Sequence, residues 1–138
     1  MSYQRNEVLV HTEEEQLYKE NILDYYKHPR NREQLSHPTI KHRELNPLCG
    51  DDITVYLEIK GNKISKATFT GSGCAISQAA ISMLTEKIVG KTVDEVKKIT
   101  KEEITKMLGI DISPGRIKCA LLCLKTTMKG IQQYEQEK

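Results

Sequence analysis

The most regular pattern in the chain is an alternation of apolar and polar residues from Ile53 to Ile59. Successive side chains of a strand point to opposite faces, so this alternation predicts a β-strand with one side on a core. Gly61 and Asn62 then form a pair typical of a two-residue hairpin turn. A second strand is predicted over residues 64–70. Its apolar residues change parity, which requires a bulge or a longer turn.

Helical patterns flank this hairpin on both sides. Long helices are predicted over residues 13–27, 74–89 and 114–134, and a weaker strand near residues 39–45. Two short helices are expected between the second and third long helices, because a threonine is followed three residues later by a glutamate at Thr92 and again at Thr100. Gly109 should end the second of them. The order of elements predicts an α+β fold, with helices packed on an antiparallel sheet of about three strands.

The last predicted helix carries an apolar stripe with spacings of four and three residues, which is typical of a core-facing side. The stripe consists of Ile117, Leu121, Leu124, Met128 and Ile131. Cys119 falls on the opposite side of this helix, and Arg116 and Cys123 share its face at i−3 and i+4. A guanidinium beside a thiol favours the thiolate, which points to Cys119 as a functional residue. Cys123 is interpreted as a half-buried small residue.

Length and composition narrow the classes of protein. The 138 residues suggest one domain over residues 13–138, preceded by a flexible lead-in over residues 1–12. The net charge is only +2, from 21 basic and 19 acidic residues, so there is no electrostatic case for nucleic acid or an anionic membrane. No apolar run is long enough for a bilayer or a signal peptide, which predicts a cytoplasmic protein. Disulfides are rare there, so the four cysteines suggest metal-binding or reactive thiols.

The segment Asn46-Pro47-Leu48-Cys49-Gly50-Asp51 places a thiol and a carboxylate two positions apart. In extended chain such residues point to the same side, and the intervening glycine allows them to converge. Soft sulfur and hard oxygen on one short loop are half of a plausible metal site. The other cysteine-bearing segments must therefore supply the remaining ligands.

Cys74 follows a glycine-rich turn at the predicted start of a helix, where free N–H groups and the helix dipole favour a thiolate. The alternative is a small buried residue that opens the helix. The four histidines are interpreted as surface residues, and only His42 is close enough in sequence to the Cys49 loop to be considered as a ligand.

These segments together resemble the IscU/SufU/NifU family of iron–sulfur cluster assembly scaffolds. The resemblance rests on Asn-Pro-x-Cys-Gly-Asp at 46–51, Gly-x-Gly-Cys-x-Ile-Ser at 71–77, a cysteine near the start of the C-terminal helix, and the segment 25–31. It covers roughly residues 16–132. It implies an IscU-like fold in which Cys49, Asp51, Cys74 and Cys119 hold a zinc ion or a [2Fe–2S] cluster.

The resemblance also implies a function and partners. The leading hypothesis is a scaffold that accepts sulfur from a cysteine desulfurase and assembles and transfers a [2Fe–2S] cluster, with an iron donor and apo iron–sulfur acceptor proteins as further partners. Cys49, Cys74 and Cys119 are the candidate sulfur acceptors, and Arg116 would stabilise a thiolate. The protein would then be a sulfur acceptor rather than a true enzyme.

Two alternatives stay open at the level of the sequence. The first is a zinc-dependent sulfurtransferase of the SufU type. Arg116 favours it, as does Lys118 at the position where the IscU branch has a histidine. The short interval from Cys74 to Cys119 is instead typical of the IscU branch. Residues 112–116 also differ from the chaperone signal of that branch. The second alternative is a small domain with a purely structural zinc.

Overall fold

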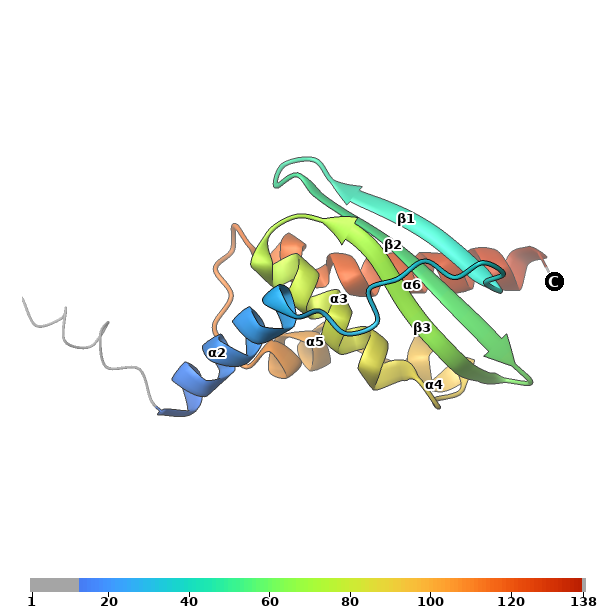
Figure 1. Ribbon diagram of the computed structural model, residues 1–138, viewed down its shortest axis with the longest axis horizontal. Coiled ribbons are helices and arrows are strands. Elements are labelled where there is room, and N and C mark those ends of the chain that lie inside the picture. The colour runs from blue at the N-terminus through green and yellow to red at the C-terminus, as the bar shows by residue number, and fades with distance from the viewer. Residues whose placement is uncertain (1–12, 138) are drawn as a thin grey trace, which may run out of the picture.

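The computed structural model describes residues 13–137 and shows a three-stranded sheet with helices (Figure 1). The elements in chain order are α2 (Glu13–Lys27), β1 (Ile40–Asn46), β2 (Asp51–Lys60), β3 (Lys63–Ser72), α3 (Ala75–Ile88), α4 (Val93–Lys97), α5 (Lys101–Leu108) and α6 (Ile117–Glu137). The predicted α+β class with an antiparallel sheet is confirmed. The predicted lead-in over residues 1–12 lies outside the described residues.

The sheet is a meander with strand order β1-β2-β3, and both pairings are antiparallel. Gly61 and Asn62 form the predicted turn between β2 and β3, with Gly61 at a φ of 64°. The change of parity in β3 is explained by a register shift between Glu58 and Ile59, so a bulge rather than a longer turn is present.

The core lies between one face of the sheet and the helices α3 and α6. Ile53, Val55 and Leu57 of β2 are completely buried on this face, as the alternation predicted. Their direct partners on β1 include Ile40 and His42, which meet α6 at Gly130. Among the strands α3 packs mainly against β3, and it also packs against α6 and α2 (Figure 1). The sheet therefore brings the β1–β2 turn and the beginnings of α3 and α6 to one end of the fold.

The orientation of α6 differs from the sequence prediction. Of the apolar stripe, Leu124 and Ile131 are buried, whereas Ile117, Leu121 and Met128 are only partly buried. Besides Leu122, the other buried residues of α6 are small, namely Cys119, Ala120, Cys123, Thr126, Thr127 and Gly130, and Gly130 lies against β1. A Cβ at Gly130 would lie 3.0 Å from Ile40 and 3.1 Å from His42. Small residues allow α6 to approach the strands closely, and this contact decides its rotation.

The helix termini mostly follow the local signals. Both predicted capping boxes are formed, at Thr92 with Glu95 and at Thr100 with Glu103. Gly109 ends α5 in the left-handed conformation with a φ of 73°. The last helix begins at Ile117 rather than near residue 114, because residues 114–116 form a turn in which Arg116 N–H bonds the carbonyl of Ser113.

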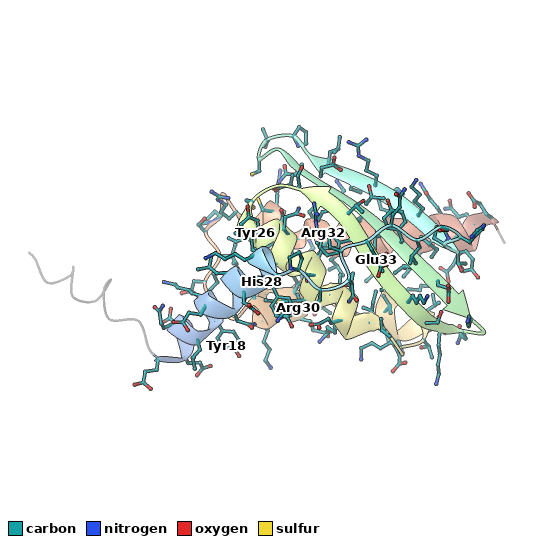
Figure 2. All side chains as sticks on the ribbon, in the orientation of Figure 1. Tyr18, Tyr26, His28, Arg30, Arg32 and Glu33 are labelled. Carbon is teal, nitrogen blue, oxygen red and sulfur yellow. The ribbon has the colours of Figure 1, made fainter. Side chains whose placement is uncertain are left out.

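The segment after α2 ties this helix to the rest of the fold (Figure 2). The backbone N–H of Arg30 donates to Ser82 Oγ on α3, and the Arg32 guanidinium donates to the carbonyl of Gly71. Asn31 adopts a φ of 63°, and its carbonyl accepts from the N–H of Phe69 on β3. No described helix is long and apolar enough to cross a membrane.

Candidate metal site

The β1–β2 connection places the central motif at the end of the sheet. Asn46 and Asp51 are direct partners in the antiparallel pairing, so their side chains share the face that α3 and α6 cover. Residues 47–50 connect them, with Gly50 at a φ of 70°. The short connection keeps the Cys49 sulfur within 4.8 Å of a carboxylate oxygen of Asp51, the first residue of β2.

Three predicted ligands lie together at this end. The ligand atoms of Cys49, Asp51 and Cys119 all lie within 4.8 Å of one another. Cys49 is exposed on the turn, whereas Asp51 is buried at the start of β2 and Cys119 is buried in the first turn of α6. The sequence placed Cys119 away from the core stripe, and its burial follows from the rotation of α6 toward the sheet. The cluster is thus open on one side, at Cys49.

The carboxylate of Asp51 is satisfied on one oxygen only. Oδ1 accepts hydrogen bonds from the backbone N–H of Cys74 at 2.9 Å and from Ser77 Oγ at 3.1 Å. Oδ2 is buried and has no hydrogen-bond partner among the described residues. A buried oxygen without a partner is costly, and a cation beside two thiols would supply the missing interaction. The donor set therefore fits a thiophilic metal.

Gly73 makes room for this carboxylate. Its φ is 149°, and a Cβ built there would lie 2.4 Å from Asp51 Oδ1 and 2.9 Å from Ser77 Oγ. Any side chain would collide with the carboxylate and would also require a backbone conformation that favours glycine. Gly73 thus fixes where the oxygen ligand sits.

Cys74, the fourth predicted ligand, lies beside the trio but outside the group defined by the 4.8 Å separation. It is the N-cap of α3, and its Sγ accepts a hydrogen bond from the backbone N–H of Ser77 at 3.4 Å. Its own N–H binds Asp51. The predicted position at a helix N-terminus is confirmed.

Arg116 faces the thiols from the turn before α6. Its pKa is raised, first by the charge of Cys74 and a hydrogen bond to that side chain, and then by the charges of Cys119 and Cys49. The guanidinium itself is exposed. It therefore places a permanent positive charge next to the sulfur atoms, as expected for a residue that stabilises thiolates.

The sulfur of Cys119 has a protein donor that the sequence interpretation missed. Asn46 Nδ2 donates to Cys119 Sγ at 3.7 Å, and both residues are buried. Burial raises the pKa of the Cys119 thiol, and the neighbouring Cys49 and Asp51 side chains add to the effect. The motif contained Asn46, but only the strand pairing with Asp51 reveals that its amide points into the cluster.

The remaining candidates lie apart from this cluster. Cys123 is buried one turn beyond Cys119, its Sγ donates to the carbonyl of Ala120, and burial raises its pKa to about 12. The ring of His42 instead lies against Gly130 and bonds Glu44 at 2.5 Å. His28 and His37 are exposed, and His11 lies outside the described residues.

Residues 17–138 match the family described as the NifU-like N-terminal domain. This chain belongs to that family. It is 33% identical over 136 residues to the zinc-dependent sulfurtransferase SufU of Bacillus subtilis, covering 86% of this chain and 92% of that one. It is 32% identical over 133 residues to the iron–sulfur cluster assembly scaffold protein IscU of Thermotoga maritima, covering 85% and 94%.

Solved structures of NifU-like proteins share the fold. A putative iron–sulfur cluster assembly scaffold protein for the SUF system from Fervidobacterium islandicum superposes with a TM-score of 0.70 at 32% identity, over 84% of this chain and 97% of that one. The N-terminal part of a NifU-like protein from Brucella abortus gives a TM-score of 0.73 at 22% identity, over 88% and 96%. The predicted family resemblance is confirmed.

Proposed function

We propose that this NifU-like domain, over residues 13–138, is a scaffold that accepts sulfur from a cysteine desulfurase and assembles and transfers a [2Fe–2S] cluster. The observation that carries the proposal is that Asp51 has a carboxylate oxygen within 4.8 Å of the sulfur atoms of Cys49 and Cys119, while its buried Oδ2 has no hydrogen-bond partner among the described residues. The SufU relative is named as a sulfurtransferase, and the IscU relative is named as a cluster assembly scaffold. An iron donor and apo iron–sulfur acceptor proteins complete the set of proposed partners.

The proposed ligands are Cys49, Asp51, Cys74 and Cys119. Cluster iron prefers thiolates, and a single carboxylate is a harder ligand that binds it less tightly. A scaffold that passes on its cargo benefits from one weak ligand. Cys74 is assigned as the third thiol because its backbone already bonds Asp51 and its sulfur lies next to Arg116.

Sulfur entry is proposed at the same cysteines. A thiolate attacks the outer sulfur of the desulfurase persulfide, a new S–S bond forms, and the desulfurase cysteine leaves as a thiolate. The acceptor must be reachable, and Cys49 is exposed on its turn while Cys119 is buried. Arg116 places a positive charge beside Cys74, at the same end of the fold. These contacts favour entry at Cys49 or Cys74.

The test is anaerobic reconstitution with ferrous iron, cysteine, a desulfurase, and dithiothreitol as the reductant of persulfide sulfur. A scaffold gains a visible chromophore from sulfur-to-iron charge transfer and then passes it to an apo-ferredoxin. A protein that forms no transferable chromophore is not a cluster scaffold. Cys123→Ala is the matched control, because it removes a buried thiol that is not among the proposed ligands.

A zinc-dependent sulfurtransferase is the second candidate, and the contact of Arg116 with the thiols favours it. In that case Cys49, Asp51, Cys74 and Cys119 would hold zinc, which keeps thiols deprotonated at neutral pH. The zinc-loaded protein would then accelerate turnover of the desulfurase and hold no cluster. Measuring sulfide release by the desulfurase with zinc-loaded and zinc-free protein separates the two candidates.

A further inference from the structure

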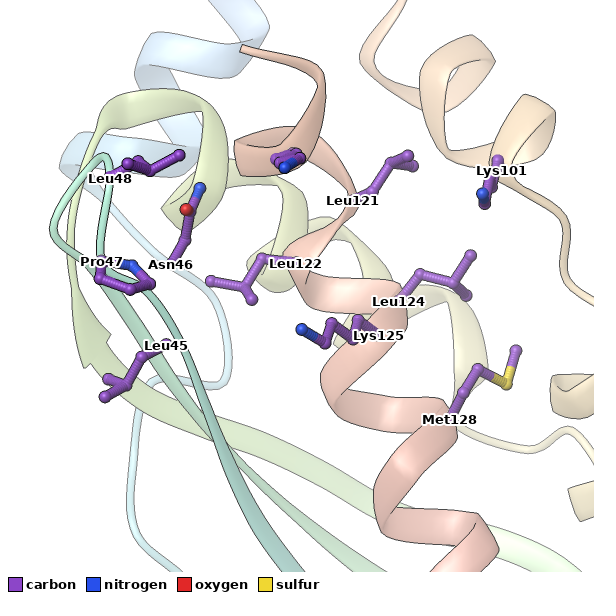
Figure 3. Close-up of a pocket in the computed structure, with 11 residues that line it drawn as sticks. Leu45, Asn46, Pro47, Leu48, Lys101, Leu121, Leu122, Leu124, Lys125 and Met128 are labelled. Atoms are coloured by element: carbon purple, nitrogen blue, oxygen red, sulfur yellow. The ribbon is translucent and has the colours of Figure 1, made fainter. Parts of the chain in front are cut away.

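An open apolar groove runs along α6 outside the metal site (Figure 3). Its volume is about 680 Å³. The side chains of Leu121, Leu124 and Met128 line it from α6, Leu45 lines it from β1, and Leu48 lines it from the β1–β2 turn. Leu48 is 85% exposed and Leu45 49% exposed. Exposed aliphatic side chains around a concave surface are typical of a binding site.

The charged residues that line the groove are all basic. Lys101, Lys118 and Lys125 line it, and no aspartate or glutamate of the described chain does. Lys125 has one distant partner, Glu44 at 3.7 Å, while Lys101 and Lys118 have no ion-pair partner among the described residues. Three lysines around an apolar floor attract a ligand that combines aliphatic groups with negative charge.

The residues of α6 that line the groove are spaced as on a helix surface that packs against another helix. Leu121, Leu124 and Met128 recur at three and four residues, the pattern of a helix surface that packs against another helix. Within the described chain Leu121 and Met128 of this row are only partly covered, whereas Leu124 is 8% exposed, because α6 turns Gly130 toward the sheet. The sequence thus encodes a helix-packing surface that the domain itself leaves open.

We propose that this groove binds an amphipathic helix of a partner protein, with bulky aliphatic side chains on one face and carboxylates along its flanks. The aliphatic side chains would insert between Leu48 and the row on α6, as in helix-in-groove recognition. The carboxylates would meet Lys101 on one side and Lys118 and Lys125 on the other. Opposite charge on the two surfaces sets the orientation and speeds association.

A second copy of this chain is not expected to bind in this groove. A two-fold interface brings the same patch of each subunit together, which here would place lysines against lysines. The groove also adjoins the metal site, since Leu48 precedes Cys49 and Lys118 precedes Cys119. A helix bound there would position its protein over the thiols. The proposal does not depend on which metal the site holds.

The experiment uses the full chain and a fluorescein-labelled helical peptide of about 16 residues, with leucines at i, i+4, i+7 and i+11 and glutamates beside them. A matched peptide carries lysines in place of the glutamates. Fluorescence anisotropy should show the acidic peptide binding at least about tenfold more tightly at low salt, with the difference shrinking as salt is added. Equal affinity of the two peptides would overturn the proposal.

Variants locate the binding. Leu121→Ser and the exposed-lysine variants Lys101→Glu and Lys125→Glu should each weaken the acidic peptide several-fold. The controls Leu17→Ser on α2, where Leu17 is 65% exposed, and Lys87→Glu on α3 should leave it unchanged. If Leu121→Ser does not fold, the lysine variants decide. Binding that the controls weaken as much as the groove variants would refute the groove as the site.

A second readout places the peptide directly. In a methyl NMR spectrum the Met128 signal should shift on titration, whereas that of Met83, which is buried in α3, should not. Dimerisation of the chain that Leu121→Ser abolishes, or binding to phosphatidylserine vesicles in preference to the peptide, would assign the groove to another occupant and overturn the proposal.

Discussion

The carboxylate of Asp51 accepts a hydrogen bond from the backbone N–H of Cys74 at 2.9 Å. This bond joins the start of β2 to the N-cap of α3, so two of the proposed ligands are fixed relative to each other by the backbone. It uses one carboxylate oxygen, while the other, Oδ2, is buried and has no hydrogen-bond partner among the described residues. The geometry of the proposed metal site therefore depends on the backbone around Cys74 as well as on the ligand side chains.

Gly73→Ala tests this dependence. The new Cβ would lie 2.4 Å from Asp51 Oδ1, and the backbone φ of 149° is strained for alanine. We expect the apo protein to lose about 1–3 kcal/mol of unfolding free energy and the metal affinity to fall as the carboxylate is displaced. Thermal unfolding and competitive zinc titration measure the two effects.

Gly90→Ala is the matched control for Gly73→Ala. Gly90 also has a positive φ, of 90°, but a Cβ there meets nothing within 4 Å. The Gly90→Ala substitution should lower the stability of the protein through backbone strain alone and leave its zinc affinity unchanged. Similar zinc affinities for the two variants would mean that Gly73 does not position the carboxylate.

Asn46→Leu removes the donor to Cys119 Sγ while keeping a side chain of similar size at a buried position. Hydrogen bonds to a metal ligand commonly account for about 10–100-fold in affinity, so we expect a loss of that order. Zinc titration against a chromophoric chelator measures this loss of affinity. An unchanged affinity, with normal folding by circular dichroism, would show that this amide is structural only.

Cys123 should be chemically silent. Complete burial raises its pKa to about 12, so the thiol stays protonated at neutral pH and is shielded from reagents. Cys123→Ala should keep one metal per chain, at a cost of roughly 1–2 kcal/mol for the cavity. Cys119→Ala should lose the metal. Mass spectrometry after brief iodoacetamide treatment of the native apo protein should find Cys49 modified and Cys123 free.

Metal removal should lower the melting temperature without unfolding the domain. The buried sheet face and the two formed capping boxes do not involve the site, so the apo chain should keep its helical circular dichroism. A metal present at a thousand times its dissociation constant adds about 4.1 kcal/mol by mass action. Coil-like spectra after treatment with a chelator would contradict this.

The sequence predicted best where structure is decided locally. The boxes at Thr92 and Thr100, the turn at Gly61 and the end of α5 at Gly109 each depend on a few neighbouring residues. The same holds for Cys74 at the start of α3. The bulge in the β2–β3 hairpin was predicted only as one of two options, since register depends on both strands.

The rotation of α6 could not be read from its periodicity. The apolar stripe is present in α6, but it does not set which side of the helix faces the sheet. Close approach to β1 requires small residues, and the contact of Gly130 with Ile40 and His42 decides which side faces the sheet. For the same reason Cys119 is buried although its position looked solvent-facing. The contact of Asn46 with Cys119 joins residues 73 positions apart, so no local pattern reveals it.

X-ray absorption at the zinc edge of the zinc-loaded protein tests the proposed site most directly. It counts sulfur ligands at about 2.3 Å and oxygen ligands at about 2.0–2.2 Å. Ligation by Cys49, Asp51, Cys74 and Cys119 predicts three sulfurs and one oxygen in the wild type, and two sulfurs after Cys74→Ala. Four sulfurs in the wild type, or a spectrum that Cys74→Ala leaves unchanged, would contradict this assignment of the ligands.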